Sequence, residues 1–189
     1  ATAVAAFAAV RALFKRREQI DKPTAAPEPP ALPDTRHQIG SAAAGFVGRG
    51  AVLDEIAAAL AGGGAAIMAS LEGMGGVGKT AVARLAARRL IDAGRFKDAH
   101  LFIDLQGFTP GAEPKAPAAA LAELLRPLVP PDADLPDDVE ALGRLWRAAT
   151  EKLDMLLFLD NASDEAQVRP LLTGHQSCVT IITSRNRLA

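Results

Sequence analysis

One eight-residue segment constrains this chain more than any other. Residues 73–80 read GMGGVGKT and match the pattern G-x-x-x-x-G-K-[ST] without a mismatch. Glycines carry no Cβ, so such a loop can turn tightly enough for several backbone N–H groups to converge on one anion. The pattern predicts a phosphate-binding loop in which Lys79 reaches the β- and γ-phosphates and the Thr80 hydroxyl binds Mg²⁺. The helix that begins there would direct the positive end of its dipole toward the nucleotide.

The segments on either side of the loop fit this interpretation. Residues 65–71 (AAIMASL) are a short apolar run, and residues 81–93 have apolar residues at helical spacing. Gly94 follows at the position where a glycine commonly ends a helix. An accidental glycine-rich turn would not need this strand–loop–helix context, so we predict a nucleotide-binding site.

The composition limits the other classes of protein. The chain has 189 residues, 49% of them hydrophobic, which suits one soluble domain of ordinary size with extra segments. A formal net charge of −1 gives no support for direct nucleic-acid binding by this segment. Cys178 has no partner cysteine, and we expect it to be buried in a protein of the reducing cytoplasm. The three histidines have no metal-ligand spacing, and we expect ordinary surface or edge residues: His37, His100 and His175.

The pattern along the chain predicts three parts. Residues 1–20 have apolar residues at helical spacing and a basic cluster, so we predict an amphipathic helix at the end of an upstream domain; the end of a membrane helix is the alternative. Residues 21–44 contain five prolines and are predicted to be an extended linker. Residues 45–189 are predicted to form an incomplete nucleotide-binding domain that stops before its last core strand and lid.

Apolar runs alternate with helical patterns throughout residues 45–189. Near-continuous apolar runs predict strands of a parallel sheet that is covered by helices on both faces, which is an α/β fold of the P-loop type. The predicted strands are residues 65–71, 100–105, 155–159 and 179–183. The predicted helices are residues 51–60, 81–93, 117–128, 138–153 and 164–172, the last capped by Ser163.

Three residues at the ends of the later strands are candidates for the chemistry. Asp160 follows a buried strand, where an α/β sheet places its ligands, and we predict that it holds Mg²⁺ together with Thr80; a turn cap is the alternative. Asn161 stands where many such ATPases carry a second acid. Asparagine cannot act as a base but can hold a water, so we predict slow hydrolysis. Arg185 follows the last strand and would sense the γ-phosphate if that strand lies beside the first; a solvated arginine is the alternative.

Five segments, in this order, resemble the nucleotide-binding domain of the STAND class of signalling ATPases. The similarity is greatest to the NB-ARC or AP-ATPase branch found in bacterial antibiotic-regulatory proteins with tetratricopeptide tails, and it covers residues 45–189. The segments are FVGR (46–49), GMGGVGKT (73–80), HLFIDLQGF (100–108), LLFLDNA (156–162) and TIITSRNRL (180–188).

This resemblance implies an AAA+-like fold in which ATP/ADP exchange switches the protein between closed and self-associated states. It implies that Arg49 lies near the adenine and ribose. Gly50 stands where the family often has glutamate, which leaves any role of that side chain in doubt. The predicted catalytic residues are Lys79, Asp160, Asn161 and Arg185. The predicted nucleotide-binding residues are Val47, Gly48, Arg49, Gly73, Met74, Gly75, Gly76, Val77, Gly78, Lys79, Thr80 and Ala81.

The sequence therefore predicts a Mg-ATP/ADP-binding switch domain of a multidomain bacterial signalling or transcription-regulatory ATPase. The alternative is a scaffold that binds adenine nucleotide without useful hydrolysis and supports oligomerisation, for example in anti-phage defence. A ParA/MinD-type ATPase would have lysine at position 74, which is Met74 here. A GTPase would need an Asn-Lys-x-Asp motif, and residues 161–164 read NASD.

Overall fold

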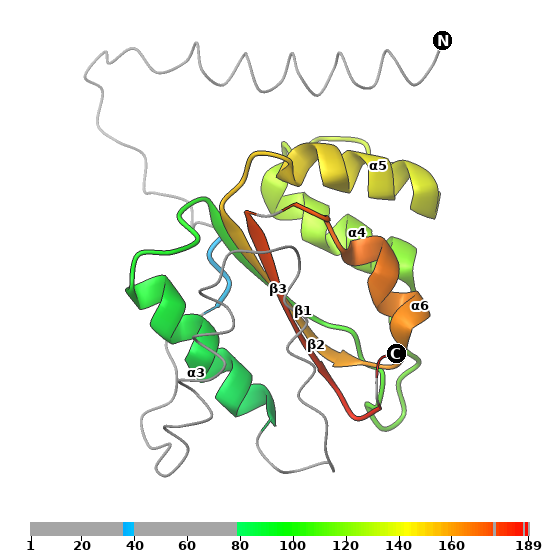
Figure 1. Cartoon of the computed structure of the whole chain (residues 1–189). Coiled ribbons are helices and arrows are strands. Elements are labelled where there is room, and N and C mark those ends of the chain that lie inside the picture. Colours follow the sequence, from blue (N-terminus) through cyan, green and yellow to red (C-terminus); the bar gives the residue numbers. More distant parts are fainter. Residues whose placement is uncertain (1–35, 40–78, 176, 187, 189) are drawn as a thin grey trace, which may run out of the picture. The chain divides into compact units, whose positions relative to one another are not determined.

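The computed structural model describes residues 36–39, 79–175, 177–186 and 188 (Figure 1). These residues all belong to one compact unit, Asp34–Ala189. The predicted helices at 1–20 and 51–60, the strand at 65–71, the loop at 73–78 and the segment at 47–49 lie outside the described residues. Among the described residues, none of the helices has the length and apolar character needed to cross a membrane.

Three parallel strands form the described sheet. They are β1 (Ala99–Asp104), β2 (Met155–Ala162) and β3 (Cys178–Ser184), hydrogen-bonded in the order β1-β2-β3. Asp104 is in register with Asp160 across the β1–β2 pair, and the register between β2 and β3 shifts after Leu159. All seven residues of β3 are buried, as expected for a strand covered on both faces. The prediction of a parallel α/β sheet is confirmed for these three strands.

Helices cover both faces of this sheet (Figure 1). Helix α3 (Lys79–Asp92) packs on one face, where Ala83 and Ala86 join a buried cluster with Phe158 and Ile181. Helices α4 (Pro117–Leu125), α5 (Val139–Thr150) and α6 (Glu165–Val168) lie over the opposite face. The alternation of side chains along each strand therefore divides the core into two layers.

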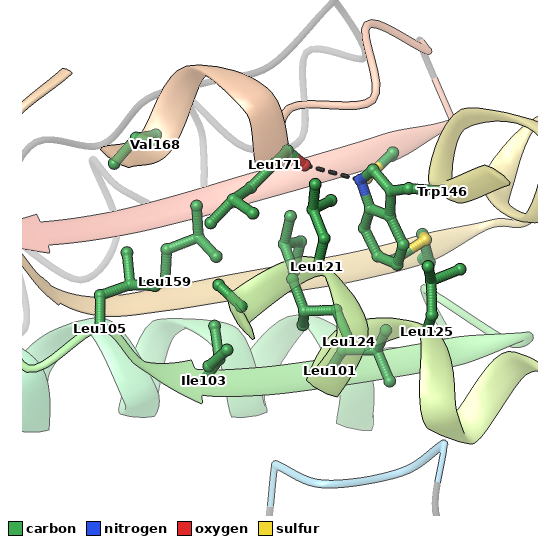
Figure 2. Packing of buried hydrophobic residues seen from close by; sticks show 14 of the residues in the cluster. Leu101, Ile103, Leu105, Leu121, Leu124, Leu125, Trp146, Leu159, Val168 and Leu171 are labelled. Atoms are coloured by element: carbon green, nitrogen blue, oxygen red, sulfur yellow. Dashed lines mark hydrogen bonds between the residues drawn. The ribbon is translucent and has the colours of Figure 1, made fainter. Parts of the chain in front are cut away.

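The larger layer is organised around Trp146, whose side chain is fully buried. Its indole Nε1 donates a hydrogen bond of 2.8 Å to the carbonyl oxygen of Leu171 (Figure 2). An indole N–H that is removed from water needs such a partner. This bond ties α5 to the 3-10 turn Arg169–Leu171 that follows α6.

Three helices are shorter than their sequence patterns predicted, and one of them, α5, ends at Thr150 instead of continuing to 153. α4 ends at Leu125 and α6 at Val168, and each continues as a 3-10 turn that contains a proline. Proline lacks the N–H that would continue the α-helical hydrogen bonds. The prediction that Ser163 caps the last helix is wrong, since Asp164 is the cap and accepts a 2.9 Å bond from the N–H of Gln167. A carboxylate is the stronger acceptor at the positive end of a helix.

Four residues of the predicted linker pack against the sheet. His37 forms an isolated parallel bridge with His100, Gln38 donates its N–H to the carbonyl of His100 at 2.9 Å, and Ile39 is buried on the α3 side. His100 was predicted to be a surface or edge residue: it lies on β1, at the edge of the described sheet, but this segment covers that edge and leaves the side chain only 7% exposed. Cys178 is buried as predicted, and burial raises the pKa of its thiol.

Candidate functional site

Polar side chains gather where the strands end. Along β1 and β2, Phe102 and Phe158 face α3, so alternation directs Asp104 and Asp160 to the same face at the carboxyl ends. Thr183 lies near the carboxyl end of β3 and on the same face, and Thr80 lies in the first turn of α3. The carboxyl ends of parallel strands are where α/β sheets bind ligands. This group of four side chains is the candidate site.

The centre of the site is a contact between Thr80 and Asp160. The Thr80 hydroxyl donates a hydrogen bond of 2.8 Å to Asp160 Oδ1, across 80 positions of the chain. Both residues are half-buried. Hydroxyl and carboxylate oxygens are the hard ligands that Mg²⁺ prefers. The two side chains expected to share a metal ion therefore touch, and their chemistry suits that ion.

The remaining ligands of such an ion would come from elsewhere. Among the described residues, no group of three or more His, Cys, Asp or Glu side chains could hold a metal ion. Mg²⁺ commonly keeps several waters and binds one or two protein groups together with phosphate oxygens. The donor set at Thr80 and Asp160 matches that mode of binding rather than an all-protein cage.

Thr183 is a member of the site that the sequence analysis missed. Its side chain is 3% exposed, its hydroxyl donates to Asp160 Oδ1, and the backbone N–H of Asn161 donates to its Oγ1 at 3.0 Å. The hydroxyl thus links the carboxylate to the backbone of the next residue on β2. Alternation along the last strand could have indicated that Thr183 faces the loop side, but its partner depends on the strand order.

Asn161 is held by the loop between β1 and α4. The side-chain Nδ2 of Asn161 donates to Thr109 Oγ1 at 3.0 Å and to Asp104 Oδ1 at 3.4 Å. The backbone carbonyl of Asn161 accepts the Gly107 N–H at 2.7 Å. Both N–H bonds of a side-chain amide are thereby directed at protein atoms. The side-chain nitrogen of Asn161 therefore ties the loop to β2, and a water held by this amide stays a prediction.

The approach of that loop to β2 requires a glycine. A Cβ on Gly107 would lie 2.4 Å from the backbone nitrogen of Ser163 and 2.6 Å from the carbonyl oxygen of Asn161. Gln167 joins the two ends of the loop, because its Nε2 donates to the carbonyls of Leu105 at 2.8 Å and Lys115 at 2.9 Å. The loop is therefore attached at its two ends and along the end of β2.

The other predicted site residues are only partly described. Lys79 is the first residue of α3. Ala81 lies in the first turn of α3 and is exposed. Arg185 is exposed, with its guanidinium carbon 5.5 Å from the centroid of the Phe108 ring in the same loop. The structure therefore brings Thr80, Asp160 and Asn161 together and directs Arg185 to the loop beside them.

Two curated bacterial proteins resemble this chain. "Regulatory protein AfsR" of Streptomyces coelicolor is 38% identical over 158 residues, which is 80% of this chain and 16% of that protein. "Regulatory protein AfsR" of Streptomyces griseus is 34% identical over 178 residues, 93% of this chain and 18% of that protein. The chain thus spans less than a fifth of the length of these relatives. No family model matches the chain.

Proposed function

We propose that the chain is a Mg-ATP/ADP-binding switch segment of a bacterial transcription-regulatory ATPase, in which slow ATP hydrolysis resets the switch. The phosphate-binding pattern at residues 73–80 supports a nucleotide, and the similarity to two proteins named as regulators supports a regulatory role. Self-association in the ATP-bound state and a cytoplasmic location are part of the same proposal.

The observation that carries the proposal is the 2.8 Å contact between the Thr80 hydroxyl and Asp160. A P-loop hydroxyl and an acid from a later strand are the two protein groups that hold Mg²⁺ in this class of site. The metal, when bound, neutralises charge on the β- and γ-phosphates. Thr80 and Asp160 would hold it, Lys79 would bind the phosphates, and Arg49 would lie near the adenine.

The deciding experiment is a calorimetric titration of ATP, ADP and GTP, each with Mg²⁺, into the unmodified protein and the Lys79→Ala variant. We expect adenine-selective binding that Lys79→Ala abolishes without changing the thermal unfolding midpoint, because Lys79 serves phosphate and not the core. Lys97→Ala is the matched control, since Lys97 is an exposed lysine just before the amino end of β1. Unchanged affinity in Lys79→Ala would refute the site.

A scaffold that binds nucleotide without useful hydrolysis is the second candidate. The engagement of the Asn161 amide with Thr109 and Asp104 favours it, because that nitrogen is directed at the loop and not at a water. Formation of ADP from bound ATP separates the two candidates. A protein that binds ATP and forms no ADP over many hours would be the scaffold.

A further inference from the structure

A second carboxylate lies on the strand beside Asp160. Asp104 ends β1 and is in register with Asp160. Neighbouring parallel strands are about 4.8 Å apart, and residues in register direct their side chains to the same face. Asp104 is exposed, so its carboxylate is open to solvent. Position 161 holds asparagine where many such ATPases carry a second acid, and Asp104 supplies a carboxylate on the neighbouring strand.

The carboxylate of Asp104 is anchored through one oxygen. The backbone N–H of Gln106 donates to Oδ1 at 2.8 Å, and Nδ2 of Asn161 approaches the same oxygen at 3.4 Å. Hydrogen bonds from N–H groups fix the orientation of a carboxylate. With Oδ1 anchored by two nitrogens, Oδ2 is the oxygen that is left to accept a proton from water.

The backbone beside the two aspartates is held in an unfavourable conformation. Gln106 has φ of +58° and Asn161 has φ of +58°, and both are non-glycine residues in the left-handed region. This conformation costs a non-glycine residue such as Gln106 about 1 kcal/mol or more, and less for asparagine, and backbone strain of this kind concentrates at functional sites. The close backbone contact of Gly107 with Asn161 and Ser163 maintains the arrangement. The chain thus maintains a strained geometry at the ends of the two strands that carry the aspartates.

We propose that Asp104 is the general base of ATP hydrolysis at this site, an inference that rests on the proposed function. The oxygen of a water forms a bond to the γ-phosphorus as the bond to the β–γ bridging oxygen breaks, and ADP leaves with that electron pair. The proton of the water passes to Asp104 Oδ2 and then to solvent, and inorganic phosphate is released.

A neutral residue at position 161 is part of this arrangement. The Asn161 amide donates to Asp104, whereas an aspartate there would have no N–H to give and would place a like charge beside it. Asn161→Asp, which restores the acid found in faster ATPases, is therefore expected to slow hydrolysis here. A rate in Asn161→Asp above that of the unmodified protein would overturn the role of Asp104.

The test is single-turnover hydrolysis of MgATP by the unmodified protein, Asp104→Asn and Asp98→Asn, with MgATP affinity measured for each by calorimetry. Asparagine keeps an oxygen that can accept the Gln106 N–H, so Asp104→Asn removes the base and preserves the turn. Asp98→Asn is the matched control. Asp98 is an exposed aspartate just before the opposite end of β1 and also accepts a backbone N–H, from Asp154 at 2.8 Å.

We expect Asp104→Asn to bind MgATP within twofold of the unmodified protein and to hydrolyse it about 100-fold more slowly, with Asp98→Asn unchanged. An unchanged rate in Asp104→Asn, or an equal loss in both variants, would overturn the inference and leave Asp104 as a turn residue. An unmodified protein that binds MgATP without hydrolysing it would also overturn it, while nucleotide binding would stand. An unmodified protein that binds no nucleotide would refute the proposed function itself.

Discussion

Replacing Thr183 with valine removes one oxygen from the candidate site and changes little else. Valine has nearly the shape of threonine, so no cavity forms at this 3% exposed position. Asp160 Oδ1 loses the hydroxyl that donates to it, and the N–H of Asn161 loses its 3.0 Å acceptor. A buried group left without its partner costs about 1–3 kcal/mol, and we expect the free energy of unfolding to fall by that amount.

The same substitution reports on how Asp160 is held. Residues that orient a metal ligand typically contribute about 10–100-fold to metal affinity. We therefore expect Thr183→Val to weaken MgATP binding by about tenfold or more while binding of ATP in the presence of EDTA stays the same. Thr183→Ser keeps a hydroxyl and is expected to retain most of the MgATP affinity that Thr183→Val loses.

The assays are denaturant unfolding and calorimetric titration with ATP. The titration is done once in the presence of Mg²⁺ and once in the presence of EDTA. Thr180→Val is the matched control, since Thr180 is 1% exposed on the same strand but its side chain points to the opposite face. If Thr183→Val and Thr180→Val lose the same Mg²⁺-dependent affinity, Thr183 does not position Asp160. If Thr183→Val loses no stability, the hydrogen bonds assigned to its hydroxyl are wrong.

Two further predictions concern the elements around the site. Gly107→Ala is expected to lower the free energy of unfolding by about 2 kcal/mol or more, because the added Cβ would lie 2.4 Å from the backbone nitrogen of Ser163. Gly143→Ala is the control, because the added Cβ meets only a flexible arginine side chain at 3.4 Å. This substitution within a helix is expected to raise the free energy of unfolding by about 0.5–1 kcal/mol. Equal denaturant midpoints for Gly107→Ala and Gly143→Ala would contradict the loop geometry. The backbone N–H of Gln167, followed by the Ser163 hydroxyl, lowers the pKa of Asp164. Its stabilising contribution is therefore complete at neutral pH and is lost as the pH falls through the ordinary aspartate range and below. Asp164→Asn keeps a helix cap and should lose less stability than the unmodified protein between pH 5 and pH 3 in urea titrations; parallel pH profiles would contradict the assignment.

Much of the fold could be predicted because its signals are local. The strands predicted at 100–105, 155–159 and 179–183 are present as Ala99–Asp104, Met155–Ala162 and Cys178–Ser184. Unbroken apolar runs of this length suit strands that are buried on both faces. The errors fell at element ends, where proline and the competition between Ser163 and Asp164 for a helix cap decided the outcome.

The sequence by itself indicated the phosphate-binding pattern, the parallel α/β class and the choice of Thr80 and Asp160 as partners, because each depends on residues close together in the chain or on the place of an acid at the end of a buried strand. Only the tertiary structure decided that Thr183 contacts Asp160, that Asn161 ties down the loop, and that Asp104 stands beside Asp160. Those contacts join residues 23 to 57 positions apart, and they exist because strand order and register bring three carboxyl ends to one edge of the sheet. No local pattern encodes which strand ends become neighbours, since that choice is made by the packing of the whole sheet.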